Sequence, residues 1–318
     1  MFGSQRLDSV YKKATEIPFN KDSKFVFFAD QHRGDDSLSD EFGRNKHIFN
    51  YALKHYYDND FTYVEVGDGD ELWEQKSFEV IRNAHVPTFN LLRKFFLDKR
   101  MIMLFGNHNI CYRKPARVEK DLFHVYDEYL GACEDLFPGI IVHEALILKE
   151  ARTKQEIFVV HGHQGDFLND SLFFLSFTLM RFLWRFMHII GLKNPASPAK
   201  SRRKRHKIEK MYAKWIKKNK KILICGHTHR PKFPINGDHA YFNTGSCVNP
   251  RGIFCLELTN NELSLITWRV NTRRDGTMII KRTLLNGPTS IKKYADKDKY
   301  DDYNYPDESY AESITSCE

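Results

Sequence analysis

The sequence predicts an α/β fold in which two sheets pack face to face and helices cover the outside. Three observations predict it: apolar runs of strand length, helix-length segments between them, and closely spaced strands in the second half. The runs typical of buried strands are residues 24–30, 61–68 and 100–107. Between these runs, residues 42–57 and 76–97 carry apolar side chains at helical spacing. Strands that alternate with helices indicate βαβ units.

The second half of the chain is predicted to hold neighbouring strands. Two apolar runs close together in sequence are residues 139–150 and 155–162. Three later runs are predicted to form hairpins: residues 239–246, 252–270 and 276–285. The hairpin turns are expected at Asn260-Asn261 and Asp275-Gly276, because Asn, Asp and Gly tolerate the backbone conformations of tight turns. These strands would complete the two sheets.

Composition places the chain among globular proteins with reduced thiols. It has 318 residues, of which 42% are hydrophobic, so a large core is expected and global disorder is not. The six cysteines are far apart and form no CxxC pair, which argues against a disulfide framework or a structural zinc site. The first 19 residues are polar and charged, unlike a secretory signal. These features predict a cytoplasmic protein.

Charge is spread unevenly along the chain. The formal net charge is +8, yet residues 200–221 hold twelve Lys or Arg against one Glu. Just before them, residues 167–190 are rich in Phe, Leu, Met and Trp but contain Arg181 and Arg185. Their longest charge-free stretch is shorter than the ~20 residues that a membrane span needs. An acidic tail without apolar periodicity ends the chain and is predicted to be disordered.

These patterns predict a core with one insertion and two extensions. The core is expected to comprise residues 24–166 and 220–286. Residues 167–219 are predicted to form a helical cap that is first apolar and then basic. Residues 1–23 are treated as an N-terminal extension, and residues 287–318 as the acidic tail.

Side chains that can bind metal lie at the ends of five predicted strands, the fifth of which is the apolar run of residues 222–225. They are Asp30 and His32, Asp68, Asn107 and His108, His161, and finally His227 and His229. Any one of them alone would be read as a turn, cap or packing residue. Five such strand ends in order are hard to explain by packing, and open α/β sheets place their sites at the carboxyl ends of strands. Carboxylates mixed with neutral imidazoles suit transition-metal ions.

The ordered motifs resemble those of the calcineurin-like metallophosphoesterase superfamily. In this chain they read DQH, GDGDE, GNHN, HGH and GHTH, and the resemblance covers about residues 24–285. It implies a four-layer α-β-β-α sandwich of the metallophosphoesterase type with a helical cap insertion. The layout is most similar to that of UDP-2,3-diacylglucosamine hydrolases, which also carry an apolar and basic insertion between the last two motifs.

The resemblance also implies roles for single residues. One metal would be bound by Asp30, His32 and His229, the second by Asn107, His161 and His227, and Asp68 would bridge them. Asp70 competes for the bridging role, but Asp68 directly follows the strand and fits the GDxxE motif with Glu71. We expect two divalent ions, with Mn²⁺ preferred and Zn²⁺ or Fe as alternatives.

The catalytic residues implied by the resemblance are His108 and Asn109. His108 would stabilise charge in the transition state or protonate the leaving oxygen. The family usually has Asp or Glu at the next position, where it orients the imidazole, but this chain has Asn109. The Asn109 amide oxygen can accept a hydrogen bond from the ring, yet it cannot stabilise an imidazolium by charge. His163 and Asp166 are further candidates for substrate contacts, with a surface role weighted equally.

The expected reaction is hydrolysis of a phosphoester or pyrophosphate bond, in which a hydroxide between the metals attacks phosphorus. The substrate is expected to be small and phosphorylated, with lipid-linked phosphates and nucleotide sugars as the leading classes. The apolar and basic insertion favours peripheral contact with an anionic membrane surface; a plain helical cap with a solvated basic face is the alternative. Two further hypotheses stay open: a nuclease that holds the nucleic-acid backbone on its basic segment, and a non-catalytic scaffold.

Overall fold

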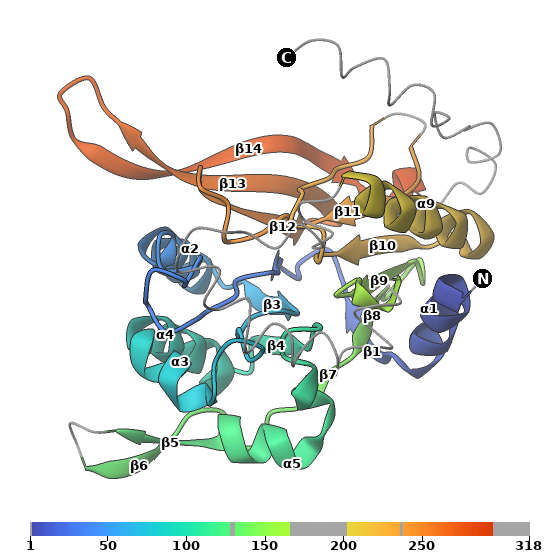
Figure 1. The fold of residues 1–318 in the computed structure, drawn as a ribbon. Coiled ribbons are helices and arrows are strands. Elements are labelled where there is room, and N and C mark those ends of the chain that lie inside the picture. The colour runs from blue at the N-terminus through green and yellow to red at the C-terminus, as the bar shows by residue number, and fades with distance from the viewer. Residues whose placement is uncertain (1, 128–130, 166–201, 236–237, 295–318) are drawn as a thin grey trace.

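The computed structural model describes residues 2–127, 131–165, 202–235 and 238–294. Within them, two sheets face each other between outer layers of helices (Figure 1). The larger sheet contains, in spatial order, β14 (Met278–Ser290), β13 (Glu262–Thr272), β12 (Ile253–Thr259), β2 (Phe25–Phe28), β3 (Thr62–Val66), β4 (Met101–Leu104) and β7 (Val142–His143). The smaller sheet contains β1 (Thr15–Phe19), β8 (Ala145–Glu150), β9 (Glu156–Val160), β10 (Ile222–Cys225) and β11 (Tyr241–Asn243).

Alternation of side chains along β2 explains the layering. Phe25 and Phe27 face the core between the sheets, whereas Val26 and Phe28 face the helices. Those helices are α2 (Lys46–Asp58), α3 (Phe78–Ala84) and α4 (Val86–Leu97). The smaller sheet is covered by α1 (Phe2–Lys13) and α9 (Arg202–Asn219). The predicted α-β-β-α sandwich is therefore confirmed.

Short elements complete the description. They are α5 (Pro115–Val118), a π turn at Glu119–Phe123, the small hairpin of β5 (His124–Asp127) and β6 (Ala132–Asp135), and 3-10 turns at Ile110–Arg113, His163–Gly165 and Ile291–Tyr294. Among the described residues, no helix is both long and apolar enough to cross a membrane.

Three predicted elements differ in the structure. Residues 76–97 hold two helices, because the chain leaves helical geometry at His85 and Pro87 lies in the first turn of the next helix. Residues 139–150 were expected to be one strand, but β7 pairs in the larger sheet and β8 in the smaller one. Residues 239–246 were expected in a hairpin; instead β11 lies parallel to β10. Both predicted turns do join antiparallel strands, β12 to β13 and β13 to β14.

The N-terminal residues belong to the core, contrary to the prediction of an extension. β1 pairs in parallel with β8, and Leu7 and Val10 of α1 are buried. Asp8 fixes α1 to α9, because its carboxylate accepts hydrogen bonds from Trp215 Nε1 at 2.8 Å and Lys218 Nζ at 2.7 Å. Residues 1–23 therefore supply a helix and an edge strand, and both depend on contacts with residues far away in the sequence.

The predicted cap also needs correction, because α9 is a core helix. Its apolar face, Ile208, Tyr212, Trp215 and Ile216, is buried in the main core. The apolar segment 167–190 lies outside the described residues. The predicted tail begins too early at residue 287, because β14 continues to Ser290 and the following turn buries Ile291 and Tyr294. Residues 295–318 also lie outside the described part.

Candidate metal centre

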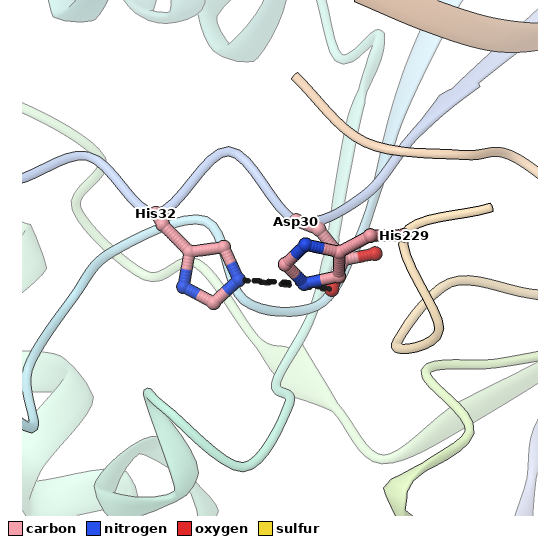
Figure 2. Close-up of side chains that lie close together, drawn as sticks. All are labelled: Asp30, His32 and His229. Carbon is pink, nitrogen blue, oxygen red and sulfur yellow. Dashed lines mark hydrogen bonds and ion pairs between the residues drawn. The ribbon is translucent and has the colours of Figure 1, made fainter. Parts of the chain in front are cut away.

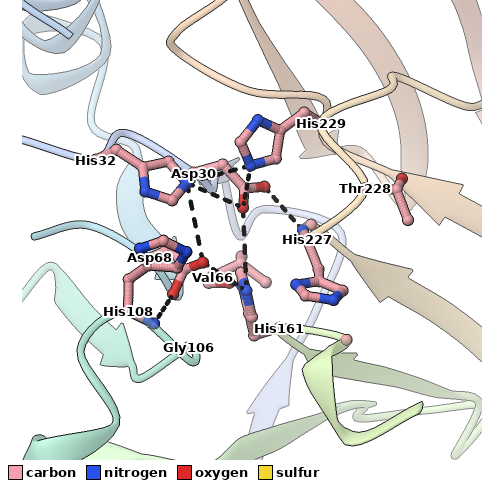
Figure 3. A network of polar contacts seen from close by, with 12 residues as sticks. Asp30, His32, Val66, Asp68, Gly106, His108, His161, His227, Thr228 and His229 are labelled. Atoms are coloured by element: carbon pink, nitrogen blue, oxygen red, sulfur yellow. Dashed lines mark hydrogen bonds and ion pairs between the residues drawn. The ribbon is translucent and has the colours of Figure 1, made fainter. Parts of the chain in front are cut away.

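The predicted site residues meet where strands of both sheets end (Figure 3). β2, β3 and β4 run parallel, so the segments that follow them carry their side chains to one edge of the larger sheet. β9 and β10 are likewise parallel in the smaller sheet. The larger sheet supplies Asp30, His32, Asp68, Asn107 and His108, and the smaller sheet supplies His161, His227 and His229.

The backbone at five of the seven predicted ligands is left-handed. Asp30, His32, Asp68, His227 and His229 have φ angles between 49° and 66°. Non-glycine residues rarely adopt this conformation, because each such residue costs about 1–3 kcal/mol and persists only where its surroundings enforce it. Here the surroundings do so: the amide of His32 donates to Asp68 O at 2.9 Å, and that of His227 donates to Asp30 Oδ2 at 2.8 Å. Strain of this kind clusters at functional sites.

Two glycines allow the strand ends to approach each other. A Cβ atom at Gly106 would lie 2.1 Å from Asp68 Oδ1. A Cβ atom at Gly226 would lie 2.4 Å from the Cβ of Ala29 and 2.7 Å from Asp30 Oδ2. Both positions therefore need glycine for space beside a predicted ligand.

The first cluster comprises Asp30, His32 and His229 (Figure 2). His229 Nε2 lies 3.2 Å from Asp30 Oδ1 and 3.1 Å from His32 Nε2. One ligand atom from each residue falls within 4.8 Å of the others, which is the spacing of side chains around a single ion. The structure thus brings together the three residues predicted for the first metal.

The second cluster comprises Asp68, His161 and His227. His161 Nε2 lies 3.1 Å from Asp68 Oδ2, and the same carboxylate oxygen lies 3.9 Å from His32 Nε2 in the first cluster. Asp68 therefore lies between the two clusters. His161 Nδ1 donates to Val66 O at 2.9 Å, so Nε2 is the nitrogen left to bind a cation.

Asp70, the competing bridge, faces elsewhere. Its Oδ1 accepts a hydrogen bond from Arg33 Nε at 2.8 Å, and Arg33 also contacts Glu65 through both terminal nitrogens. All three side chains are fully buried beneath the site. The charge of Asp70 is thus used to pair Arg33, whereas that of Asp68 is directed to the two clusters.

Asn107 has the property expected of an oxygen ligand. Its Oδ1 atom is buried and has no hydrogen-bond partner, a condition that costs free energy unless a cation or donor occupies the place. The next residue holds this loop against Asp68, since the His108 amide donates to Asp68 Oδ1 at 2.8 Å. Together with the two clusters, this donor set fits two divalent ions.

Electrostatics favours ionised carboxylates in the site. Burial would raise the pKa of Asp68, but His161 and His108 hold it well below its usual value. Burial likewise opposes ionisation of Asp30, and His229 and His161 lower its pKa. The buried carboxylates therefore keep the negative charge that cations require.

His108 is oriented by Glu71 and not by Asn109, which corrects the sequence-based expectation. His108 Nδ1 lies 2.7 Å from Glu71 Oε1. Asn109 is buried, and its Oδ1 instead accepts a hydrogen bond from the Gly106 amide at 2.7 Å. On its other side, the His108 ring stacks on Trp73, with ring centroids 4.2 Å apart and planes at 21°. Asn109 thus shapes the loop, and a carboxylate still supports the imidazole.

Sequence reasoning missed the roles of Glu71 and Trp73. Glu71 was visible as the last residue of GDxxE, and that motif was the only available signal for it. Trp73 carried no signal beyond its nearness to the motif. Of the two further candidates, His163 is buried and neither ring nitrogen has a hydrogen-bond partner, while Asp166 lies outside the described residues.

The chain was compared with protein families, curated proteins and solved structures. The sequence profile of the calcineurin-like phosphoesterases matches residues 23–231, so the chain belongs to that family. No curated protein matches the sequence. The solved structure of a cold-active protein tyrosine phosphatase from a psychrophilic Shewanella species is similar, with 14% identity, a TM-score of 0.35, and coverage of 86% of this chain and 84% of that one. Vps29 of Chaetomium thermophilum is similar at 10% identity and a TM-score of 0.33, covering 83% of this chain and 96% of that one.

Proposed function

We propose that this protein hydrolyses phosphoester or pyrophosphate bonds with the help of two divalent metal ions. The observation that carries this proposal is the position of Asp68 between two separate Asp/His clusters. One ion would be held by Asp30, His32 and His229, the other by Asn107, His161 and His227, with Asp68 facing both. When bound, such ions supply Lewis acidity toward phosphate oxygens and lower the pKa of an attacking water.

A residue of the chain itself, His108, is placed to act on the leaving oxygen. His108 lies beside the clusters without belonging to the predicted ligand set, and its ring orientation is fixed by Glu71 and Trp73. An imidazole held in this way can donate a proton to a leaving oxygen or stabilise negative charge on it.

The test is turnover with added metal. Metal-free protein would be supplied with Mn²⁺, Zn²⁺ or Fe²⁺ and offered a chromogenic phosphodiester, phosphomonoesters, UDP-sugars, lipid pyrophosphates and single-stranded DNA. We expect metal-dependent hydrolysis of at least one class, with Mn²⁺ the most effective ion. Absence of turnover from every substrate with every ion would instead support a non-catalytic scaffold on this fold.

For the substrate, we propose a phosphorylated amphiphile at an anionic membrane surface. The supporting observation is α9: its outward face carries exposed Arg203, Lys207, Lys210 and Lys214, which recur every three or four residues and form one basic stripe. Each Lys or Arg near an anionic membrane contributes about 1 kcal/mol, so these residues together would hold the protein there reversibly.

The membrane proposal is tested by vesicle co-sedimentation at low and high salt. The wild type is compared with a variant in which Lys207, Lys210 and Lys214 are all changed to Gln. We expect the wild type to bind phosphatidylserine vesicles at low salt, and both high salt and the triple change to weaken that binding. Binding to single-stranded DNA in preference to vesicles would favour the nuclease alternative, and binding to neither would leave the stripe as a solvated helix face.

A further inference from the structure

His163 is a buried imidazole that has no role in the predicted metal centre. It lies two residues after the predicted ligand His161, at the start of the 3-10 turn His163–Gly165. Its side chain is fully buried, and neither Nδ1 nor Nε2 has a hydrogen-bond partner within the part of the chain that the structure describes. Buried polar atoms without a partner cost free energy. A residue that only fills space would not need to carry this cost on two atoms.

The His163 ring lies next to the second cluster. Its centroid is 5.5 Å from that of His161, and the His161 ring is in turn 5.2 Å from that of His227 (Figure 3). The ring of Phe105 is 6.3 Å from His163, and Phe105 follows β4 at the start of the loop that carries Asn107. His163 is therefore a neighbour of the residues that would hold the second ion.

The turn that carries His163 is held in place by hydrogen bonds at Gly162. The Gly162 amide donates to Gln164 Oε1 at 3.1 Å, and the Gly162 carbonyl accepts a hydrogen bond from the hydroxyl of Tyr212. Gly162 has a φ angle of 114°, and a Cβ atom there would lie 2.7 Å from the Tyr212 hydroxyl oxygen. The backbone that carries the imidazole is thus fixed by the fold before any ligand binds.

The chemistry of the ring suits an oxygen ligand better than a cation. A neutral imidazole has one N–H donor and one acceptor nitrogen, and burial favours the neutral form. The ligand atoms that lie close enough together to share the second ion belong to Asp68, His161 and His227, and His163 is not among them. A phosphoryl group drawn to that ion would bring acceptor oxygens to the same place.

We propose that His163 donates a hydrogen bond to an oxygen of the phosphoryl group held at the second ion. This inference rests on the proposed function and adds a substrate-binding residue from the smaller sheet. His108 is placed to act on the leaving oxygen, whereas His163 would contact the phosphoryl group, which all of the substrates share. The loss of His163 is therefore expected to affect esters of good and poor leaving groups alike.

His163→Phe is the sharpest test, because phenylalanine fills a similar volume and has no polar atom. If His163 only packs, this variant should keep the phosphate affinity of the wild type. His163→Gln retains an N–H donor and tests whether that donor is what matters. His124→Phe is the matched control: it makes the same replacement at an exposed residue of β5, where the imidazole pairs with Asp135.

The first measurement is the binding of inorganic phosphate, which requires no turnover. Each protein is loaded with Co²⁺, freed of excess ion and titrated with phosphate in a calorimeter. We expect His163→Phe to bind phosphate about 10–100-fold more weakly than the wild type, the loss expected for one hydrogen bond to a charged group. His163→Gln should recover part of this loss, and His124→Phe should match the wild type. All four proteins should contain the same amount of metal.

The second measurement is thermal unfolding of the metal-free proteins. We expect the Tm of His163→Phe to equal or exceed that of the wild type, because the change removes two buried polar atoms that have no partner among the described residues. A variant that is at least as stable and yet binds phosphate more weakly would separate a binding role from a packing role.

The third measurement is turnover of aryl phosphate esters at saturating metal. We expect kcat/KM of His163→Phe to fall by the same factor for good and poor leaving groups, because the contact is made to the phosphoryl group. A loss confined to poor leaving groups would contradict the proposal and place His163 at the leaving oxygen.

The outcomes separate this inference from the proposed function. A wild type that binds Co²⁺ and phosphate, together with unchanged phosphate affinity in His163→Phe, would overturn the role of His163 alone. Loss of one ion from His163→Phe would also overturn it and make His163 a metal ligand. A wild type that binds no Co²⁺ and hydrolyses nothing would overturn the proposed function as well. If His163→Phe does not fold, His163→Leu replaces it in each measurement.

Discussion

Two residues of this site, Asp68 and Asn107, have features that are energetically unfavourable in isolation. Asp68 is buried and has a left-handed backbone. One of its carboxylate oxygens accepts a hydrogen bond from the His108 amide, and the other faces His161 and His32. Asn107 keeps a buried oxygen without a hydrogen-bond partner. Both features cost stability in the absence of a cation, and the binding of a cation would offset these costs.

We predict that Asp68→Ala abolishes turnover and lowers the metal content by at least one ion per chain. The change removes the carboxylate that lies between the two clusters, so neither ion keeps its position. Activity assays and elemental analysis of the purified variant measure both effects. Asp70→Asn, which affects the pairing with Arg33, serves as the comparison; undiminished activity in Asp68→Ala would contradict the two-metal assignment.

His108→Ala is predicted to lower the rate by roughly 10²–10⁴-fold without loss of metal. The side chain is oriented by Glu71 and lies outside the predicted ligand set, so its loss removes a proton donor and leaves the clusters in place. The loss should be largest for esters with poor leaving groups. Equal losses for all leaving groups would argue against proton donation and leave electrostatic stabilisation as the role of His108.

At the scale of secondary structure elements, the site depends on strands that end together and on a helical layer that holds the smaller sheet. α9 buries Tyr212, Trp215 and Ile216, and α1 packs beside it through Leu7 and Val10. Tyr212 also donates a hydrogen bond to Gly162 O, directly after His161. The outer helices thus support the segments that carry the ligands of the smaller sheet.

We predict that Asp8→Asn destabilises the fold by about 1 kcal/mol at pH 7, because the Asp8 side chain is 26% exposed and its charged contacts are partly screened. Burial would raise the pKa of Asp8, but contacts with Lys218 and Trp215 lower it below 3.8. A lowered pKa means that the charged form stabilises the fold above that value and that this contribution disappears as the pH falls. The difference in Tm between wild type and variant should therefore narrow below pH 4; a constant difference would contradict the charge-based explanation.

At the scale of the whole molecule, the predicted ligands come from both sheets. Asp30, Asp68 and Asn107 follow strands of the larger sheet, while His161, His227 and His229 follow strands of the smaller one. Ions bound by these residues would therefore tie the two sheets together at one end of the sandwich. Binding that requires the folded arrangement stabilises the folded state by mass action.

We predict that removal of metal by a chelator lowers the Tm and that added Mn²⁺ restores it. A ligand at 100 times its Kd stabilises the folded state by about 2.7 kcal/mol. With an unfolding entropy of about 2.1 cal/mol/K per residue, each kcal/mol corresponds to about 1.5 °C in Tm for a chain of 318 residues. Differential scanning fluorimetry of the wild type and Asp68→Ala measures the effect. The variant should respond much less, and an equal response of both proteins would place the stabilising ion elsewhere.

The sequence by itself determined the layered fold class and the residues at the strand ends. Apolar runs of strand length, helical spacing between them and turn residues are local patterns, so they identify β2, β3, β4 and the hairpins without knowledge of contacts. Asp30, Asp68 and Asn107 could be proposed as neighbours because the parallel strands that precede them end at the same edge of one sheet.

Tertiary structure decided which residues complete that edge and which elements complete the core. β11 joined β10 and not a hairpin, and α9 joined the core and not a cap, because pairing and packing depend on partners far away in sequence. The same holds in the site: Glu71 and Asn109 are both polar residues near His108, and only the folded chain places the Glu71 carboxylate at the His108 ring and turns the Asn109 amide toward Gly106. A hydrogen bond needs both groups in place, and no local pattern encodes the distance between them.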